Sequence, residues 1–407
     1  MVSREVIQET VADYQKEIEQ ATIYPRSIFA QVEKTLQSEE VTVLTGIRRC
    51  GKTCLTYELL KKYPGVYINF ENEKLINFSI DDFDKLFSLA IEQNKKILVL
   101  DEIQNIKGWE KFAARIHKKI KVFALGSNSS LLSSEFSSTL TGRTITIHVT
   151  PVSFGEFLEF KKLAPDNPTE KRAYLEKYLI LGGFPRIVLS ENNELISEYF
   201  NRIIYRDVIP RFGVQKPESL NRLALYLMSN NARPFSYRKL KEYCDLSHET
   251  TVKEYIYYLE QAYLLSTLNC FDPSLKRQEL RPKKTYMTDT AFKHLGQTSD
   301  QEKGIMLENA VYLELNRKLK FEEKLYYYKN GVEVDFVLCE GLKPTTCYNV
   351  AYELETKETF DREVQGLLKI RGKLKTKDHY LISLYPPKFD IPRGIIYLDA
   401  AEFLLGV

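Results

Sequence analysis

The sequence predicts an α/β fold, in which a doubly wound parallel sheet is followed by a helical unit and by a second α/β unit. Three observations lead to this prediction. Short apolar runs alternate with helical stretches up to about residue 150, helical patterns follow, and strand-like runs return after residue 285. The chain has 407 residues, which is too long for one ordinary domain.

The first predicted domain covers residues 1–150. It begins with an amphipathic helical pattern that breaks near Tyr24-Pro25-Arg26. Five apolar runs follow, at 41–44, 66–70, 97–100, 121–125 and 144–147. Because continuous apolar runs of this length are typical of strands covered on both faces, we expect a buried parallel sheet with helices on either side.

Three further domains are predicted downstream. Residues 151–216 have a helical pattern, interrupted at Gly182-Gly183-Phe184-Pro185, and are expected to form a helical lid or linker. In residues 217–284, two short helices joined by a tight turn at Asp245-Leu246-Ser247 predict a winged-helix-like domain. Residues 285–407 mix a helix with strands and predict a second α/β domain.

Composition excludes several classes of protein. Lys plus Arg number 58 and Asp plus Glu 55, so the chain is no polycation and any nucleic-acid surface must be local. No run approaches the roughly 18–20 apolar residues of a membrane span, so no membrane contact is expected. The six Cys form no CxxC pair, which argues against a zinc site and a disulfide framework. The acidic first turns do not resemble a signal peptide, and we expect a cytoplasmic protein.

The strongest motif is G-x-x-x-x-G-K-T, which follows the apolar run 41–44 and precedes a helical pattern. Its glycines let backbone N–H groups surround phosphates, and the helix N-terminus adds partial positive charge. We expect ATP with Mg²⁺ here, Lys52 reaching the β- and γ-phosphates and the Thr53 hydroxyl ligating the metal. The predicted nucleotide-binding residues are Gly46, Ile47, Arg48, Arg49, Cys50, Gly51, Lys52, Thr53 and Cys54.

A pair of carboxylates follows another predicted strand. The run 97–100 leads directly into Asp101 and Glu102. We expect Asp101 to hold the metal together with Thr53, and Glu102 to act as the general base that activates the attacking water.

Two further candidates come from strand ends. The run 121–125 leads through Gly126 into Ser127 and Asn128, and a polar side chain there can sit between the γ-phosphate and the water. Arg143 stands before the next run, where a guanidinium could stabilise transition-state charge within the chain or across a subunit boundary. A plain Ser-rich turn and a surface arginine are the alternatives.

The sequence resembles a family of prokaryotic ATPases of the AAA+ class (AAA_14 type) with a C-terminal DUF4143 domain. The segments that carry the resemblance are TGIRRCGKT (45–53), LVLDEIQ (98–104), LGSNS (125–129), LTGR (140–143), PVSFGEF (151–157), GGFP (182–185), YRDV (205–208) and KTYMTD (284–289). The resemblance implies a P-loop NTPase core, fused to a winged-helix unit and to a restriction-nuclease-like fold.

DNA is one predicted partner of the middle unit. Its second helix would present a polar face, and the cation-rich segment 276–284 could form a basic wing that makes salt-sensitive phosphate contacts. Glu249 and Glu254 near that face oppose this interpretation. Packing, or contact with a protein partner or a second copy of the chain, remains the alternative.

The C-terminal unit raises the question of a nuclease site. Restriction-type folds place a helix Glu, a strand Asp and an E-x-K strand around Mg²⁺, and Glu308 and Asp335 match the first two positions. Asn349 and Ala351 stand where the Glu and Lys are expected, whereas a literal E-x-K begins only at Glu355. This departure favours an inactive nuclease fold that serves in docking.

The leading functional hypothesis is an Mg-ATP-dependent hydrolase of AAA+ type that couples its nucleotide state to DNA or partner binding. The predicted catalytic residues are Lys52, Glu102, Ser127, Asn128 and Arg143. The alternatives are a slow nucleotide-gated switch in signalling or defence, and an active Mg²⁺-dependent nuclease.

Overall fold

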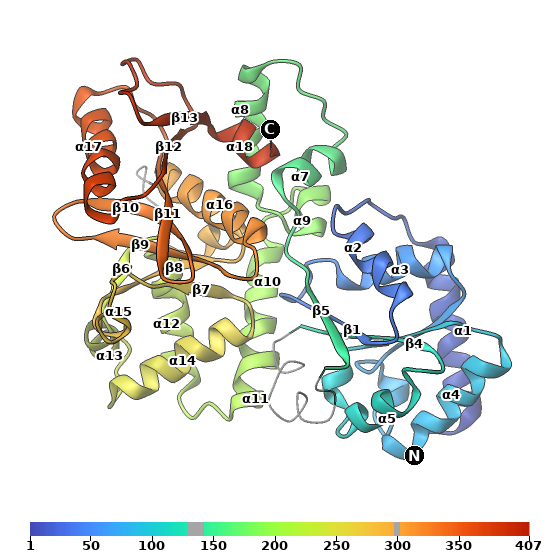
Figure 1. Ribbon diagram of the computed structural model, residues 1–407. Coiled ribbons are helices and arrows are strands. Elements are labelled where there is room, and N and C mark those ends of the chain that lie inside the picture. Colours follow the sequence, from blue (N-terminus) through green and yellow to red (C-terminus); the bar gives the residue numbers. More distant parts are fainter. Residues whose placement is uncertain (128–139, 141, 297–301, 407) are drawn as a thin grey trace. The chain divides into compact units, whose positions relative to one another are not determined.

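The computed structural model describes residues 1–127, 140, 142–296 and 302–406. Its contacts divide the chain into two compact units (Figure 1). The first unit comprises Met1–Pro151 with Gln261–Tyr263, and the second comprises Val152–Glu260 with Leu264–Val407. Among the helices that the structure describes, none combines the length and the apolar character that a membrane span requires.

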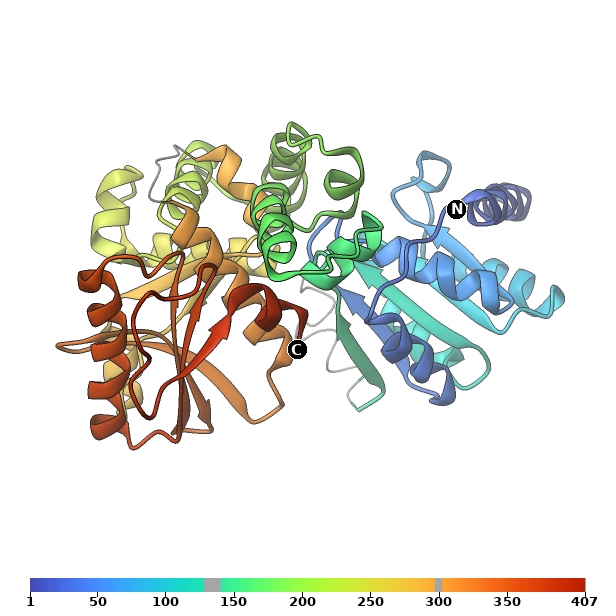
Figure 2. The same cartoon turned by 90° about the horizontal axis from the view of Figure 1, so that it is seen from above.

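A five-stranded sheet forms the centre of the first unit. Its strand order is β2-β3-β4-β1-β5, and all neighbours are parallel, so the strands run side by side in one direction (Figures 1 and 2). The strands are β1 (Val41–Thr45), β2 (Gly65–Asn69), β3 (Ile97–Asp101), β4 (Lys121–Gly126) and β5 (Thr144–His148). This confirms the predicted parallel sheet. Because the strands are parallel, their carboxyl ends lie at one edge of the sheet, and the order β3-β4-β1 makes the loops after these three strands neighbours there.

Helices cover both faces of this sheet. Figure 1 shows α2 and α3 on one side and α4 and α5 on the other. The helices are α1 (Arg4–Gln20), α2 (Phe29–Lys34), α3 (Lys52–Lys62), α4 (Phe83–Glu92) and α5 (Trp109–Ile116). Helix α1 starts at an N-cap, Ser3, whose side chain accepts a hydrogen bond from the Val6 amide, and it contacts β2 and α4.

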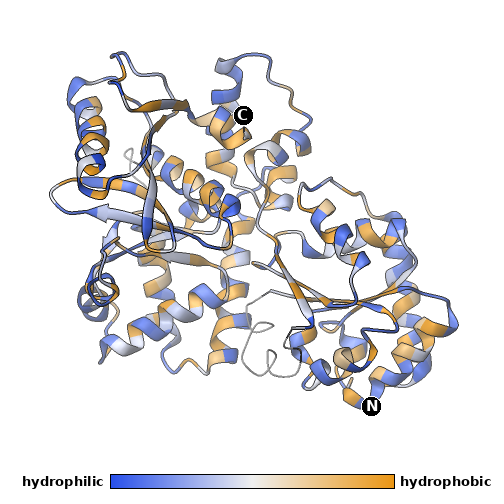
Figure 3. Ribbon diagram, viewed as in Figure 1, coloured by the Kyte–Doolittle hydropathy of each residue, from blue (hydrophilic) through white to orange (hydrophobic). Residues whose placement is uncertain are grey.

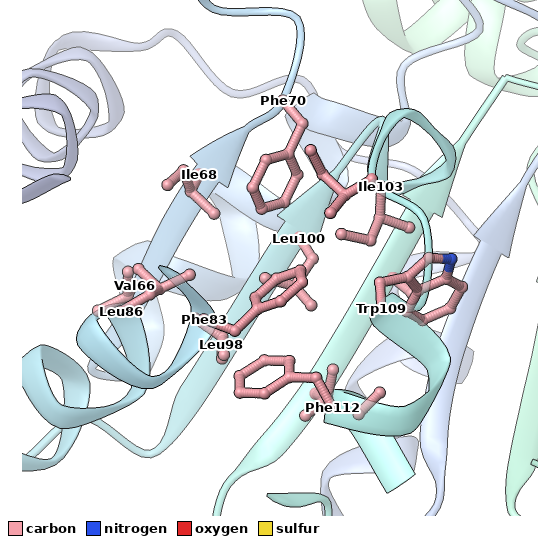
Figure 4. Packing of buried hydrophobic residues seen from close by; sticks show 14 of the residues in the cluster. Val66, Ile68, Phe70, Phe83, Leu86, Leu98, Leu100, Ile103, Trp109 and Phe112 are labelled. Atoms are coloured by element: carbon pink, nitrogen blue, oxygen red, sulfur yellow. The ribbon is translucent and has the colours of Figure 1, made fainter. Parts of the chain in front are cut away.

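The core of the first unit lies between the sheet and helices α1, α4 and α5. The strands contribute alternate residues such as Leu98 and Leu100, and the helices contribute aromatic rings, of which Phe83 and Phe112 stack with centroids 4.3 Å apart (Figure 4). Trp109 is buried in the same cluster. The residues of β3 and β4, which are mostly hydrophobic (Figure 3), are buried on both faces of the sheet.

The second unit begins with helices and then forms a small antiparallel sheet of order β6-β8-β7. The first helices are α7 (Phe154–Phe160), α8 (Pro168–Leu181), α9 (Pro185–Ser190), α10 (Leu195–Arg202) and α11 (Ile209–Phe212). The elements around the small sheet are α12 (Pro217–Ser229), β6 (Pro234–Phe235), α13 (Tyr237–Tyr243), α14 (Glu249–Gln261), β7 (Leu265–Leu268), α15 (Leu275–Leu280) and β8 (Lys283–Met287).

The basic segment 276–284, which was predicted as a possible basic wing, is only partly exposed. Residues up to Leu280 form helix α15, and the guanidinium groups of Arg277 and Arg281 both pair with Asp272. Lys284 lies on β8 with only 2% of its surface exposed. Charge counting failed here because it does not show which cations have buried anionic partners.

The last part of the second unit is a five-stranded mixed sheet of order β13-β12-β11-β10-β9. Strands β9, β10 and β11 are antiparallel neighbours, whereas β11, β12 and β13 are parallel. Helix α17 contacts β10, β11 and β12, and α16 contacts β11 (Figure 1). The elements are α16 (Glu302–Lys318), β9 (Glu323–Lys329), β10 (Glu333–Glu340), β11 (Lys343–Ala351), α17 (Lys357–Leu374), β12 (Asp378–Ser383), β13 (Ile396–Asp399) and α18 (Ala400–Leu405).

Two motifs of the sequence, GGFP and the Asp at the end of KTYMTD, meet in the second unit. The buried carboxylate of Asp289 accepts hydrogen bonds from the amides of Gly183 and Ala291, both at 2.8 Å. Gly182 has φ +72°, and a Cβ there would lie 1.9 Å from Asp289 Oδ1. Only glycine therefore fits this turn, and the paired motifs fix the end of α8 against the chain after β8.

Candidate nucleotide-binding site

The loop between β1 and α3 has the backbone that phosphate binding needs. Gly46 has φ +145° and Gly51 φ +104°, conformations that side-chain-bearing residues rarely adopt. A Cβ on Gly46 would lie 2.0 Å from the carbonyl oxygen of Val149, so the close packing itself requires glycine. The loop leads directly into the N-terminus of α3, where the backbone N–H groups of the first turn have no partner within the helix.

Lys52 lies folded onto this loop. Its ammonium group donates hydrogen bonds to the carbonyl oxygens of Gly46 at 2.8 Å and Ile47 at 3.1 Å, and the residue is 6% exposed. Both acceptors are neutral. A phosphate oxygen is a stronger, charged acceptor, so the ammonium can exchange these bonds for bonds to a nucleotide.

The two side chains that were predicted to hold the metal touch each other. The Thr53 hydroxyl donates a 2.8 Å hydrogen bond to Asp101 Oδ2, and the Glu102 amide donates at 2.9 Å to Asp101 Oδ1. Tyr67 Oη donates a third bond, at 2.5 Å, to Oδ2. Hydroxyl and carboxylate oxygens at one place are the ligand type that Mg²⁺ prefers, so these residues fit the ion that the P-loop implies.

Glu102 lies in a buried, polar corner beside this pair. Its backbone is left-handed, with φ +50°, and its carboxylate accepts hydrogen bonds from Gln104 Nε2 and, at 3.3 Å, from Ser127 Oγ. Burial, together with the nearby charge of Asp101, raises the pKa of Glu102 to about 7. A carboxyl group with such a pKa can accept a proton near neutral pH. Gln104 Oε1 is buried and has no hydrogen-bond partner among the described residues, which leaves an acceptor for a polar ligand or a water.

The structure places the three residues predicted at or near strand ends in different surroundings. Ser127 is buried and donates a hydrogen bond to Glu102, and its predicted place between the γ-phosphate and the water stays a prediction. Asn128 lies outside the described residues. Arg143 is exposed, and its carbonyl accepts a 2.9 Å hydrogen bond from the Val41 amide at the start of β1. Its predicted role in charge stabilisation stays a prediction.

Sequence reasoning missed Tyr67. It lies on β2, two residues before the strand ends, and its side chain is on the same face as Asn69, whose register partner is Asp101. The rings of Tyr14 and Tyr57 pack edge-on against it at 5.0 and 5.1 Å. The signal that could have found it is a long polar side chain at this register position of the strand beside the carboxylate strand.

Two arginines brace the loop. Arg48 Nη2 donates to both carboxylate oxygens of Glu71, at 2.7 and 2.8 Å, which ties the loop to the segment after β2. Arg26 donates to the carbonyl oxygens of Cys50 at 3.0 Å and Thr150 at 2.8 Å. Arg48 was expected as part of the motif, but the partner Glu71 and the role of Arg26 were not.

Of the two predicted cysteines, Cys50 is buried inside the loop and Cys54 is exposed on α3.

The strand order, the glycine loop and the adjoining Thr–Asp pair define the first unit as a P-loop NTPase fold of the AAA type. Residues 38–158 match the family model described as an AAA domain. A second match, to the domain of unknown function DUF8612, covers residues 172–301. The resemblance suggested a DUF4143 domain at residues 285–407, but the match found downstream of the AAA domain is to DUF8612 and lies at residues 172–301.

Relatives extend over most of the chain. The uncharacterized protein MJ1544 of Methanocaldococcus jannaschii is 32% identical over 398 residues, which cover 92% of this chain and 88% of that protein. The chain belongs to the same family as this archaeal protein. An uncharacterized protein of Haemophilus influenzae is 28% identical, covering 73% of this chain and 80% of its own length. The solved structure of the Walker-type ATPase PABY2304 of Pyrococcus abyssi matches with a TM-score of 0.46 and 17% identity, over 67% of this chain and 95% of that one.

Tyr67→Phe tests whether this tyrosine positions the metal ligand. The change removes one hydrogen bond to Asp101 and keeps the ring packing. We expect the Mg²⁺ concentration that half-saturates nucleotide binding to rise about tenfold, because groups that orient metal ligands have effects of this size. Mg²⁺ titration of fluorescent-nucleotide binding measures it.

Tyr57→Phe is the matched control. Its hydroxyl donates to Glu17 and not to Asp101, while its ring contacts the same Tyr67 ring. It should leave the Mg²⁺ requirement unchanged. Equal Mg²⁺ dependence of the Tyr67 variant and wild type would show that Asp101 needs only its other two partners.

Proposed function

We propose that this chain is a Mg²⁺-dependent ATPase of the AAA+ type. The observation that carries the proposal is the 2.8 Å hydrogen bond between Thr53 and Asp101 beside the phosphate-binding loop, with Glu102 next in sequence and hydrogen-bonded to Ser127. Together, these contacts combine metal ligands, a candidate base and a phosphate cradle at one edge of the sheet. The match of residues 38–158 to an AAA domain supports the same class.

Each side chain has a defined part in this proposal. Lys52 leaves the carbonyl oxygens of its own loop and donates to phosphate oxygens, while the N–H groups of the loop and of the first turn of α3 bind the remaining ones. Thr53 and Asp101 would hold Mg²⁺, which supplies positive charge against the charge that develops on the phosphates. Glu102 orients the attacking water and accepts its proton, and Ser127 keeps the Glu102 carboxylate in place.

Variants of Lys52 and Glu102 separate binding from hydrolysis. Lys52→Ala should abolish tight ATP binding, because the cation that replaces the phosphate's water shell is lost. Glu102→Gln should bind ATP normally but lose roughly 100-fold or more in turnover, because the amide cannot accept a proton. Steady-state ATPase assays and nucleotide-binding titrations measure both. Wild-type turnover by the Glu102 variant would remove Glu102 from the mechanism.

The raised pKa of Glu102 predicts the pH dependence. The base works only when ionised, so kcat/KM should fall as pH drops through about 7, the pKa that burial and Asp101 give this carboxyl group. Gln104→Ala removes a hydrogen bond that lowers the pKa of Glu102, so its acidic limb should move to higher pH. Since titration of ATP is common to both proteins, the difference between the two profiles reports on Glu102. Superimposable profiles would contradict the assignment.

We further propose that the nucleotide state is coupled to DNA through a winged-helix unit built from α12, α13, α14 and the small sheet. The support is the set of exposed cations on and beside its helices, namely Arg233, Arg238, Lys239, Lys253 and Lys276. One of them is partly neutralised, since Arg238 lies 3.4 Å from Glu242. Binding would therefore be weak and carried by phosphate contacts.

Duplex DNA should raise ATP turnover at about 50 mM salt and have little effect at about 200 mM, since phosphate contacts weaken steeply with salt. ATPase titrations with duplex and single-stranded DNA at both salt concentrations measure this. Lys239→Ala should reduce the stimulation, and Lys61→Ala, on α3 of the first unit, is the control. Turnover that is slow and indifferent to DNA would favour the alternative, a nucleotide-gated switch that acts on a protein partner or a second copy of the chain.

A further inference from the structure

The second unit contains a buried cluster of charges that the ATPase site does not use. Lys284, on β8, has a side chain that is 3% exposed. Its Nζ lies 3.2 Å from Glu308 Oε1, 3.3 Å from Glu333 Oε1 and 3.6 Å from Asp335 Oδ1. An ammonium group has three N–H donors, and three carboxylates from α16 and β10 surround this one.

Two of these carboxylates are those predicted for a nuclease-type Mg²⁺ site. The structure does bring Glu308 and Asp335 together, but the cation between them belongs to the chain itself. The oxygens that face the centre are those nearest Lys284, and the other oxygen of Asp335 accepts a 2.9 Å hydrogen bond from the Val350 amide. Burial would lower the pKa of Lys284, yet the surrounding carboxylates raise it above its ordinary value, so the ammonium stays charged.

The third predicted ligand position supplies no carboxylate. Asn349 is neutral and 1% exposed, and its amide nitrogen donates to the Glu363 side chain at 2.9 Å. Its side-chain oxygen accepts a hydrogen bond from the Asp335 amide at 3.2 Å, so both ends of the amide are engaged. The literal E-x-K lies elsewhere: Glu355 pairs with Lys388 at 3.1 Å, and Lys357 begins α17. In the described part of the chain, no group of three or more His, Cys, Asp or Glu side chains is arranged to hold a metal ion.

Access is not what keeps a metal out. A cavity of about 540 Å³ is lined by Glu308, Glu333, Asp335 and Glu363, so ions from solvent can reach these carboxylates. The obstacle is electrostatic, because a divalent ion between Glu308 and Asp335 would lie within a few ångströms of a buried ammonium. We propose that the Lys284 ammonium takes the place of the divalent cation, so that this centre is a metal-free structural cluster and not a nuclease site.

Mn²⁺ binding to the full chain tests the proposal. The measurement is paramagnetic detection of bound Mn²⁺ at pH 8 without nucleotide, in an Asp101→Asn background that removes the carboxylate of the first unit. The protein with Lys284 intact should bind no Mn²⁺ through Asp335.

Lys284→Met removes the charge and keeps the length of the side chain. It should lower the midpoint of thermal unfolding by roughly 10 °C, since unpaired buried carboxylates remain, and should gain one Mn²⁺ that restores part of the loss.

Two comparisons decide the outcome. Adding Asp335→Asn to Lys284→Met should abolish the gained Mn²⁺, whereas Lys388→Met, which removes an exposed partner of Glu355, should gain none. A Mn²⁺ ion bound with Lys284 present and lost on Asp335→Asn would overturn the proposal, and this arm does not require the Lys284 variant to fold. Failure of a folded Lys284→Met variant to bind Mn²⁺ would overturn it as well. Neither result depends on ATP hydrolysis, so this test is independent of the tests of the proposed ATPase function.

Discussion

The position of β4 between β1 and β3 is the constraint on which the nucleotide site depends. In the parallel sheet, Thr45 pairs with Gly126, and the next strand along ends at Asp101. The phosphate loop, Ser127 and the two carboxylates therefore leave the same edge, although they lie up to about eighty residues apart in sequence. No single motif is sufficient to form the site, because the crossover connections between the strands bring the separate motifs together.

The Asp101 carboxylate shows how that edge is held in one geometry. Both of its oxygens accept hydrogen bonds, from a backbone amide on one side and from two hydroxyl groups on the other. These donors come from α3, from β2 and from Glu102 directly after β3, so the carboxylate is oriented by three parts of the chain and not by its own rotamer preference. A ligand group fixed in this way loses little conformational freedom when a metal binds.

Local motifs could be predicted from the sequence, but their partners could not. The octapeptide, the Asp-Glu pair and the apolar runs were enough to predict the first sheet and that Thr53 and Asp101 meet at its edge. Tyr67 was not predicted as a site residue, because a tyrosine inside an apolar strand has no distinctive sequence pattern. Lys284 was interpreted as part of a basic wing, since a run of cations in sequence does not reveal that three carboxylates from α16 and β10 surround one of them.

Lys52 and Lys284 are both buried, but the structure gives them different roles. Lys52 donates to neutral carbonyl oxygens, and charged acceptors give hydrogen bonds about twice as strong, so its move to a phosphate is favourable. Lys284 already has three carboxylates, and moving it would leave the buried charges of Glu308 and Asp335 without this cation. Burial alone therefore does not identify a functional cation. The charge of its present partners decides whether a buried lysine can exchange them for a ligand or is fixed as part of the fold.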